Sequence, residues 1–318
     1  MAKKFYAVRV GIKPGIYTTW DEAKAQVNGV KYCEYKGFMT KEEAEAFMKE
    51  KTRKAPEEIQ KINKNCEVSE KYIGADEVGK AEPLRRLYAV AAYIGEGALP
   101  IVESMGATKD SKEYTIDSDK IIRMGQGLTE FREYEDVKNE VYKTPELEVY
   151  YAVEGITNDE YNELHANGVN ANAIVSILHN RACLRLNDFL LEKDIVVEDI
   201  VIDNYMGKYD YNFAKYIKDQ ERKVQDEKPE VKFIEKAESR FPAVALASVI
   251  GSYIEHLYHE NARMKFTADG GKEDLLHFGN AKQPMMKTFE ELERVYGSLE
   301  ESKIDFKHTN YLGTFLLS

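Results

Sequence analysis

Hydrophobic and polar positions alternate along most of the chain with two periods, one typical of strands and one typical of helices. Short apolar runs predict strands at 71–76, 87–94, 147–153, 199–203 and 231–234. A longer stretch at 170–192 has helical spacing, and a second helix is expected from Pro242, where Ala243, Ala247 and Gly251 recur every fourth position. Such small residues let a helix lie close to a sheet. Strands that alternate with helices predict an α/β domain with a mixed sheet flanked by helices.

The first 50 residues predict a small unit of their own with the order β-α-β-α. Residues 5–10 alternate as a strand, and residues 31–38 read as another. Thr19 is a candidate cap for a helix that begins near Trp20, and Thr40 precedes a second helix with acidic residues in its first turn. The expected domains are therefore a small domain at 1–50, a polar linker at 51–70 and a large domain at 71–318.

Composition narrows the class of protein. The 318 residues are 43% hydrophobic, which is enough to build a core, yet no apolar run reaches the length of about 18 residues that a membrane helix needs. The N-terminal residues lack an apolar signal core. Cys33, Cys66 and Cys183 share no close spacing, which indicates reduced thiols rather than a disulfide framework or a zinc site. We therefore expect a cytoplasmic protein that does not contact membranes.

Charge is distributed unevenly between the two parts of the chain. The net charge is −11 overall, but residues 1–54 hold 12 Lys and Arg against 7 Asp and Glu, a net of +5. A basic small module joined to an acidic large one fits a module that binds phosphate groups, linked to an enzyme with several carboxylates in its active site. A plain solubility charge on the large part is the alternative, and charge alone does not separate the two.

Acidic residues follow three of the predicted strands. Asp76 and Glu77 end the first strand of the large domain, Asp203 ends a later one, and Glu238 follows the strand at 231–234. Adjacent strands would bring these side chains to one sheet edge, where four carboxylates repel one another unless a divalent cation neutralises them. Carboxylate oxygens suit Mg²⁺ or Mn²⁺, and a pair of such ions can clamp a phosphodiester during attack by water. For any one of these acids taken alone, a solvated strand end is the simpler interpretation.

Four motifs in this order resemble those of type 2 ribonucleases H. They are Ile73-Gly74-Ala75-Asp76-Glu77-Val78-Gly79-Lys80, Lys109-Asp110-Ser111-Lys112, Val201-Ile202-Asp203, and Lys236-Ala237-Glu238-Ser239 with the helix that follows. The resemblance covers about residues 71–266. Glu238 stands where ribonucleases HII usually carry Asp, which points to the HIII branch, as does the stretch around Tyr161.

This resemblance implies a ribonuclease H-like fold and a metal-dependent endonuclease. Asp76, Glu77, Asp203 and Glu238 would be the catalytic, metal-binding carboxylates. Gly79, Lys80, Ser111 and Lys112 would contact the nucleic acid, although a plain surface role suits each lysine equally well. Cleavage would leave a 5′-phosphate and a 3′-hydroxyl on the RNA strand of an RNA/DNA hybrid.

Two departures from the family pattern fall in the turn after the first strand. Ala81 stands where the family usually has the second Gly of Gly-Lys-Gly, and Arg85-Arg86 stands where Gly-Pro is usual. Ala81 adds a Cβ where the backbone is expected to approach a ribose 2′-hydroxyl. The two arginines are interpreted either as phosphate contacts or as a solvated approach to the next strand.

The small N-terminal domain has a resemblance of its own. Its aromatic and Gly-containing segments around Phe5–Arg9, Gly15–Trp20 and Tyr35–Phe38 are similar to the hybrid-binding, viroplasmin-type domain of type 1 ribonucleases H. By position, Tyr6, Trp20 and Tyr35 would form an aromatic surface and Lys36 would meet a DNA phosphate. The alternative for Trp20, the chain's single tryptophan, is a core anchor.

The sequence therefore predicts an endoribonuclease that degrades RNA in RNA/DNA hybrids with Mg²⁺ or Mn²⁺, acting as a monomer without an obligate protein partner. A hybrid-binding protein with weak or silent nuclease activity is the first alternative. A nuclease that prefers single embedded ribonucleotides or double-stranded RNA is the second. The four acids favour an enzyme over a pure binder, whereas no sequence feature separates the two nuclease hypotheses.

Overall fold

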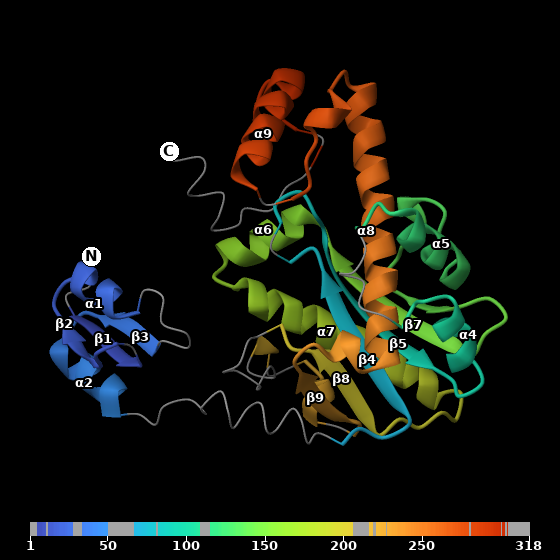
Figure 1. Ribbon diagram of the computed structural model, residues 1–318, viewed down its shortest axis with the longest axis horizontal. Helices are drawn as coiled ribbons and strands as arrows, with labels where there is room; N and C mark the ends of the chain where they lie inside the picture. The colour runs from blue at the N-terminus through green and yellow to red at the C-terminus, as the bar shows by residue number, and fades with distance from the viewer. Residues whose placement is uncertain are drawn as a thin grey trace. The chain divides into compact units, whose positions relative to one another are not determined.

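The computed structural model of the chain forms two compact units, Met1–Cys66 and Glu67–Ser318, which are described separately below (Figure 1). The residues described by the structure are 5–10, 12–27, 34–49, 67–80, 82–108, 115–205, 216–218, 221–226, 228–279, 281–299, 301–302 and 304. The predicted linker at 51–70 falls mostly outside these ranges.

The N-terminal unit is a three-stranded antiparallel sheet with two helices. Its elements are β1 (Phe5–Val10), β2 (Gly15–Tyr17), α1 (Trp20–Val27), β3 (Glu34–Phe38) and α2 (Lys41–Lys49). The strand order is β2-β1-β3. Strand β2 was not expected from the sequence, since three residues are too few to show an alternating pattern, so the order is β-β-α-β-α rather than β-α-β-α.

Both helices of this unit begin at the threonines that the sequence indicated. The Glu22 amide donates to the Thr19 hydroxyl at 3.3 Å, and the Glu43 amide donates to the Thr40 hydroxyl at 3.2 Å. In each case the glutamate side chain also accepts the backbone N–H of its threonine. These reciprocal capping bonds satisfy N–H groups that a helix start otherwise leaves without partners.

The second unit is built on a mixed sheet. Its described strands are β4 (Tyr72–Val78), β5 (Leu87–Ile94), β6 (Val141–Lys143), β7 (Val149–Ile156), β8 (Asp199–Asp203) and β9 (Glu230–Ile234). They lie in the order β6-β7-β5-β4-β8-β9. Strands β4, β8 and β9 are parallel neighbours, while β5, β6 and β7 pair in antiparallel fashion. The predicted mixed α/β sheet is confirmed.

Two long helices cover opposite faces of this sheet (Figure 1). Helix α7 (Ala171–Leu191) begins at Asn170, whose side chain accepts the Ala173 amide, and packs on one face. Helix α8 (Pro242–Ala268) begins at the predicted proline and packs on the other. The expected close approach of α8 is found at β4, where a Cβ built on Gly74 would lie 2.3 Å from the Val244 backbone nitrogen.

Gly74→Ala is therefore expected to destabilise the second unit by about 2 kcal/mol, because backbone atoms of α8 cannot yield to the added methyl group. In a domain of this size the melting temperature should fall by roughly 4–8 °C. Gly97→Ala is the matched control, since a Cβ there meets nothing within 4 Å. Equal melting temperatures for the two variants would contradict this packing.

Shorter helices complete the second unit. They are α4 (Leu99–Ser104), α5 (Asp119–Leu128), α6 (Asn158–Ala166) and α9 (Lys282–Tyr296), with the 3₁₀ turns η2 (Tyr134–Asp136), η4 (Val224–Asp226), η5 (Ala237–Ser239) and η6 (Glu273–Leu275). Helix α9 packs beside the C-terminal half of α8 through a cluster that includes Phe266 and Phe289 (Figure 1). In the described part of the chain, no helix is both long enough and apolar enough to span a membrane.

Candidate active site

Three parallel strands end at the same edge of the sheet, and each is followed or ended by an acidic residue. Asp76 lies near the end of β4, Asp203 is the last residue of β8, and Glu238 lies in η5, directly after β9. The register pairs Ala75 with Ile202, so Asp76 and Asp203 occupy the next positions of neighbouring strands. The edge that the sequence predicted is therefore formed by β4, β8 and the turn after β9.

Asp76, Asp203 and Glu238 lie on the side of the sheet that α8 covers. Side chains alternate along a strand, and Gly74 faces α8, so Asp76 two residues later faces it as well. The Ala237 amide donates to Asp203 Oδ1 at 2.9 Å, which fixes η5 against the end of β8. Asp76 and Glu238 are 7% and 2% exposed, whereas Asp203 is half-buried.

A backbone turn in the left-handed region brings Glu238 to this position. Lys236 has φ of 56°, an uncommon value for a residue with a side chain, and it lies between β9 and η5. The turn redirects the chain from the sheet into η5 and then into α8. Glu238 is thus placed by the path of the backbone, which sequence periodicity does not reveal.

Glu77 leaves the opposite face of β4. Its Oε2 atom lies 3.2 Å from Nε2 of His179 on α7, and its Oε1 atom lies 4.0 Å from Nζ of Lys80. The four predicted acids are therefore divided, with three on the α8 side and Glu77 on the α7 side of the same strand end. The sequence did not predict the contact between Glu77 and His179, which are 102 residues apart.

The donor chemistry of these acids fits a hard divalent cation, because all are carboxylates at one sheet edge. Within the described residues, however, no three His, Cys, Asp or Glu side chains already converge as a group able to hold a metal ion. Binding of Mg²⁺ or Mn²⁺ would therefore have to bring at least some of these carboxylates closer together.

Gly79 and Lys80 form the turn that follows these acids. Gly79 has φ of +80°, and a Cβ there would lie 1.7 Å from the Arg86 carbonyl oxygen, so the turn requires glycine. Lys80 Nζ donates to the Tyr205 carbonyl at 2.7 Å. Burial lowers the pKa of Lys80, while the Glu77 carboxylate opposes this shift. Lys80 is thus partly buried beside Glu77.

The remaining predicted nucleic-acid contacts in this domain lie outside the described residues. Ser111 and Lys112 belong to the segment 109–114, and Ala81 is also outside the described ranges. Their roles remain predictions.

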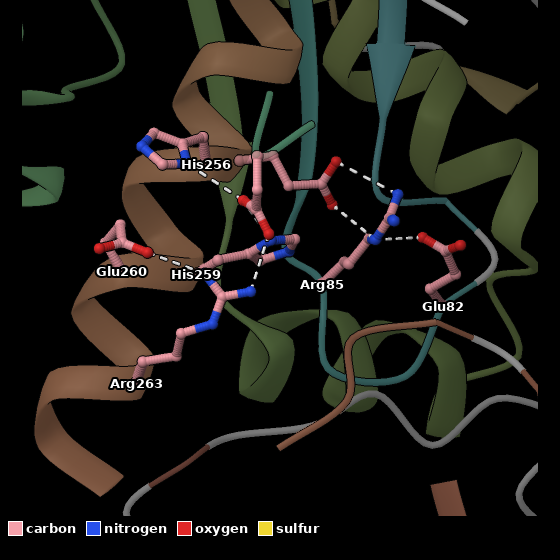
Figure 2. A network of polar contacts seen from close by, with 8 residues as sticks. Glu82, Arg85, His256, His259, Glu260 and Arg263 are labelled. Carbon is pink, nitrogen blue, oxygen red and sulfur yellow. Dashed lines mark hydrogen bonds and ion pairs between the residues drawn. The ribbon is translucent and has the colours of Figure 1, made fainter. Parts of the chain in front are cut away.

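Arg85 and Arg86 are engaged within the protein, which neither interpretation of the sequence anticipated. Arg85 forms ion pairs with Glu82 and with Glu255 of α8, the latter at 3.2 Å (Figure 2). Arg86 donates to the Tyr134 hydroxyl at 2.8 Å. Its guanidinium also lies 5.3 Å from the centroid of the Tyr258 ring. The arginines that replace Gly-Pro therefore brace the turn against α8.

A second polar network joins Asp117 to α8, as Figure 2 shows for the α8 side chains. Asp117 accepts from His256 at 3.1 Å and from Arg263 at 2.7 Å, and it lies 3.4 Å from His259. Burial opposes ionisation of Asp117, yet these hydrogen bonds outweigh it and hold its pKa below the usual range. The spacing of the three α8 residues, which places them on one helix face, was the available sequence signal.

This network predicts a loss of stability in mild acid. Burial lowers the pKa of His259 from 6.5, although Asp117 opposes the shift. Below about pH 6.5, His259 is protonated in the unfolded chain but stays neutral in the folded protein. The free energy of unfolding therefore decreases as the pH falls below that value.

Urea unfolding of the wild type and of His259→Phe between about pH 8 and pH 5 should show the difference, with a flatter pH dependence in the variant. His165→Phe, in which a half-buried histidine of α6 is replaced, serves as the control. Parallel pH profiles for wild type and His259→Phe would contradict the assignment.

In the N-terminal unit, the three predicted aromatic residues lie together. The Trp20 ring centroid is 5.6 Å from that of Tyr6 and 5.5 Å from that of Tyr35. Trp20 is 38% exposed and Tyr35 is 44% exposed, so Trp20 is not a core anchor. Lys36 is exposed on β3 next to Tyr35. Phe38 is half-buried against Phe47.

Comparison with known proteins agrees with this architecture of a ribonuclease H-like sheet plus a small β-α module. Residues 73–273 match the family Ribonuclease HII, and residues 4–48 match the Ribonuclease H1 N-terminal domain. The chain belongs to the ribonuclease HII family, with an N-terminal domain of the ribonuclease H1 type. The resemblances inferred from the motifs are thereby confirmed.

Several relatives are named ribonuclease HIII. The protein of Lactococcus lactis subsp. cremoris is 30% identical over 207 residues, which cover 64% of this chain and 61% of that protein. The protein of Geobacillus kaustophilus is 29% identical over 182 residues, which cover 57% of this chain and 50% of that protein. The chain thus spans between half and two thirds of the length of these relatives.

A solved structure shows the same fold. The crystal structure of Bst-RNase HIII in complex with Mn²⁺ aligns with a TM-score of 0.60 and 21% sequence identity, and the alignment covers 95% of this chain and 82% of that chain.

Proposed function

We propose that this protein is an endoribonuclease that hydrolyses the RNA strand of RNA/DNA hybrids and leaves 5′-phosphate and 3′-hydroxyl ends. The observation that carries the proposal is the set of acids at the edge of β4, β8 and η5, within a region that matches the ribonuclease HII family. The names of the relatives support the HIII branch, and the solved complex of Bst-RNase HIII with Mn²⁺ supports a divalent metal.

Asp76, Asp203 and Glu238 would hold Mg²⁺ or Mn²⁺ from the α8 side, and Glu77 would approach from the α7 side. When bound, the metal would supply an activated water and charge stabilisation of the leaving 3′-oxygen. Asp76 and Glu238 are buried, so their carboxylates have little contact with bulk water. The hydrogen bond from Ala237 holds Asp203 in place before substrate arrives.

Groups around this edge would orient the nucleic acid. The turn at Gly79 presents backbone close to the acids, Lys80 adds positive charge next to Glu77, and Ser111 with Lys112 would contact the phosphate backbone. In the N-terminal unit, Tyr6, Trp20 and Tyr35 offer an aromatic platform for sugar rings, with Lys36 near a phosphate. Two hybrid-binding modules on one chain raise overall affinity without new contacts. No protein partner is needed for this activity, and we propose a monomer.

Trp20→Ala should weaken hybrid binding about tenfold, since stacking on one aromatic ring contributes roughly 1–3 kcal/mol. Fluorescence anisotropy with a labelled hybrid measures the dissociation constant. Ile12→Ala, which removes another exposed apolar side chain of the same unit, should leave it unchanged. A Trp20→Ala affinity within twofold of wild type would exclude the aromatic platform.

A substrate panel tests the preference. The protein is incubated with Mg²⁺ or Mn²⁺ and an RNA/DNA hybrid, a DNA duplex with one ribonucleotide, or double-stranded RNA of the same sequence. The proposal expects the hybrid to be cut fastest. Preferential cleavage of either other duplex would assign that specificity instead, and tight hybrid binding without cleavage would define a binding protein.

A further inference from the structure

Glu77 differs from the other acids of the site in having its own support on the α7 side of the sheet. We propose that His179 is a positioning residue that fixes the carboxylate of Glu77, with Tyr205 and Ser176 fixing the imidazole in turn. This inference rests on the proposed function, because it concerns how Glu77 is presented to a divalent metal ion.

The contact between His179 and Glu77 is buried and specific. The His179 side chain is 0% exposed, and its Nε2 atom lies 3.2 Å from Glu77 Oε2. Its Nδ1 atom is buried and has no hydrogen-bond partner among the residues that the structure describes. A carboxylate only accepts, so Nε2 carries the hydrogen in this contact. Since a buried polar ring is costly without a hydrogen bond, Glu77 is the polar anchor of His179.

The imidazole is held in its plane by its neighbours. The Tyr205 ring stacks on it with a centroid distance of 5.1 Å and an interplanar angle of 12°. The Tyr205 hydroxyl shares a hydrogen bond of 2.5 Å with Ser176 Oγ, one helical turn before His179 on α7. Ser176 also donates to the Asn172 carbonyl at 2.8 Å. The ring therefore has little freedom to rotate away from Glu77.

Lys80 contacts both Tyr205 and Glu77. Its Nζ lies 5.0 Å from the Tyr205 ring centroid, donates to the Tyr205 carbonyl, and stands 4.0 Å from Glu77 Oε1. One carboxylate oxygen of Glu77 thus faces the imidazole and the other faces the ammonium. Asp76 accepts the Glu77 backbone N–H at 2.9 Å, whereas the two carboxylate oxygens of Glu77 lie against His179 and Lys80. Glu77 has a long side chain with several rotamers, and its contacts with His179 and Lys80 favour one of them before metal binds.

Three variants of the full-length protein test the role of His179. His179→Leu fills the volume without a donor, and His179→Asn keeps polarity but is too short to reach Glu77. His179→Gln places an amide N–H near the position of Nε2. The first readout is the Mn²⁺ dissociation constant from isothermal titration calorimetry, without substrate. The second is the separation of kcat from KM on an RNA/DNA hybrid.

We expect Mn²⁺ binding about tenfold weaker in His179→Leu and His179→Asn, and close to wild type in His179→Gln, because hydrogen-bond partners of metal ligands typically contribute a factor of 10–100 in affinity. kcat should fall with little change in KM. His259→Leu is the matched control. It removes another buried imidazole, 2% exposed, that contacts Asp117 rather than any of the four acids.

Unchanged Mn²⁺ affinity in His179→Leu and His179→Asn would overturn the inference while leaving the proposed function intact. If His179→Leu fails to fold, the comparison of His179→Asn with His179→Gln decides the matter. An equal loss of Mn²⁺ affinity in His259→Leu would show that the effect is general destabilisation, and this result would also overturn the inference. A wild type that neither binds Mn²⁺ nor cuts the hybrid would instead remove the proposed function, and the inference with it.

Discussion

Asp203→Asn is expected to lower kcat/KM on an RNA/DNA hybrid by about 10³-fold or more, because a metal-binding carboxylate contributes several kcal/mol to the transition state. The substitution keeps the size of the side chain and leaves an oxygen that can accept the Ala237 amide, so β8 and η5 should stay joined. What it removes is the negative charge at the end of β8. A labelled hybrid and a gel assay measure the change.

Glu198→Gln is the control for this variant, since Glu198 is an exposed acid immediately before β8, at the other end of the strand. It should retain wild-type activity. Circular dichroism and thermal melting establish that both variants are folded. Retention of more than a tenth of wild-type activity in Asp203→Asn would remove this carboxylate from the proposed catalytic set.

Glu255→Ala is expected to destabilise the second unit by about 3 kcal/mol. The Glu255 side chain is 1% exposed and lies 3.2 Å from Arg85, so its removal leaves a partly buried guanidinium with weaker compensation (Figure 2). For a unit of this size the melting temperature should fall by roughly 6–12 °C. Calorimetry or thermal melting followed by circular dichroism measures it.

Two further variants make this prediction specific. Glu260→Ala removes an acid of the same helix that is 51% exposed in its ion pair with Arg263, and it should change stability by less than about 1 kcal/mol. The double variant Arg85→Leu/Glu255→Leu should regain part of the stability lost by Glu255→Ala, because apolar side chains then replace both members of the buried ion pair and only Glu82 loses a contact. A Glu255→Ala protein as stable as Glu260→Ala would show that the ion pair does not brace the turn.

The elements that place the acids could be predicted because their signals are local. Asn170 and Pro242 mark the starts of α7 and α8, and apolar runs mark β4, β8 and β9. Parallel strands then bring their ends to one edge, which follows from topology rather than from any single residue. The position of Glu238, in contrast, depends on the left-handed turn at Lys236.

Side-chain partners distant in sequence could not be predicted in this way. Glu77 and His179 are 102 residues apart, and Arg85 and Glu255 are 170 residues apart. Each pair exists only because helices α7 and α8 pack on opposite faces of β4 and β5. No periodic pattern carries that information, since it depends on how the helices are rotated against the sheet.

The departure from the family pattern at Arg85-Arg86 illustrates the same limit. From the sequence, the arginines suggested either phosphate contacts or solvated side chains. The structure accounts for them through partners elsewhere in the fold, namely Glu255 and the Tyr134 and Tyr258 rings. The turn at Gly79 is therefore held by ion pairs and aromatic contacts to α8. These contacts are made by the two arginines that replace Gly-Pro.

The central claim is that this chain cuts the RNA strand of a hybrid in a metal-dependent manner. The most direct test uses wild-type protein and one hybrid labelled separately on its RNA and DNA strands, with Mg²⁺, with Mn²⁺ and with EDTA. We predict internal cleavage of the RNA strand with either metal, 5′-phosphate product ends, an intact DNA strand, and no cleavage in EDTA. An RNA strand that remains intact with both metals, or cleavage that persists in EDTA, would contradict the claim.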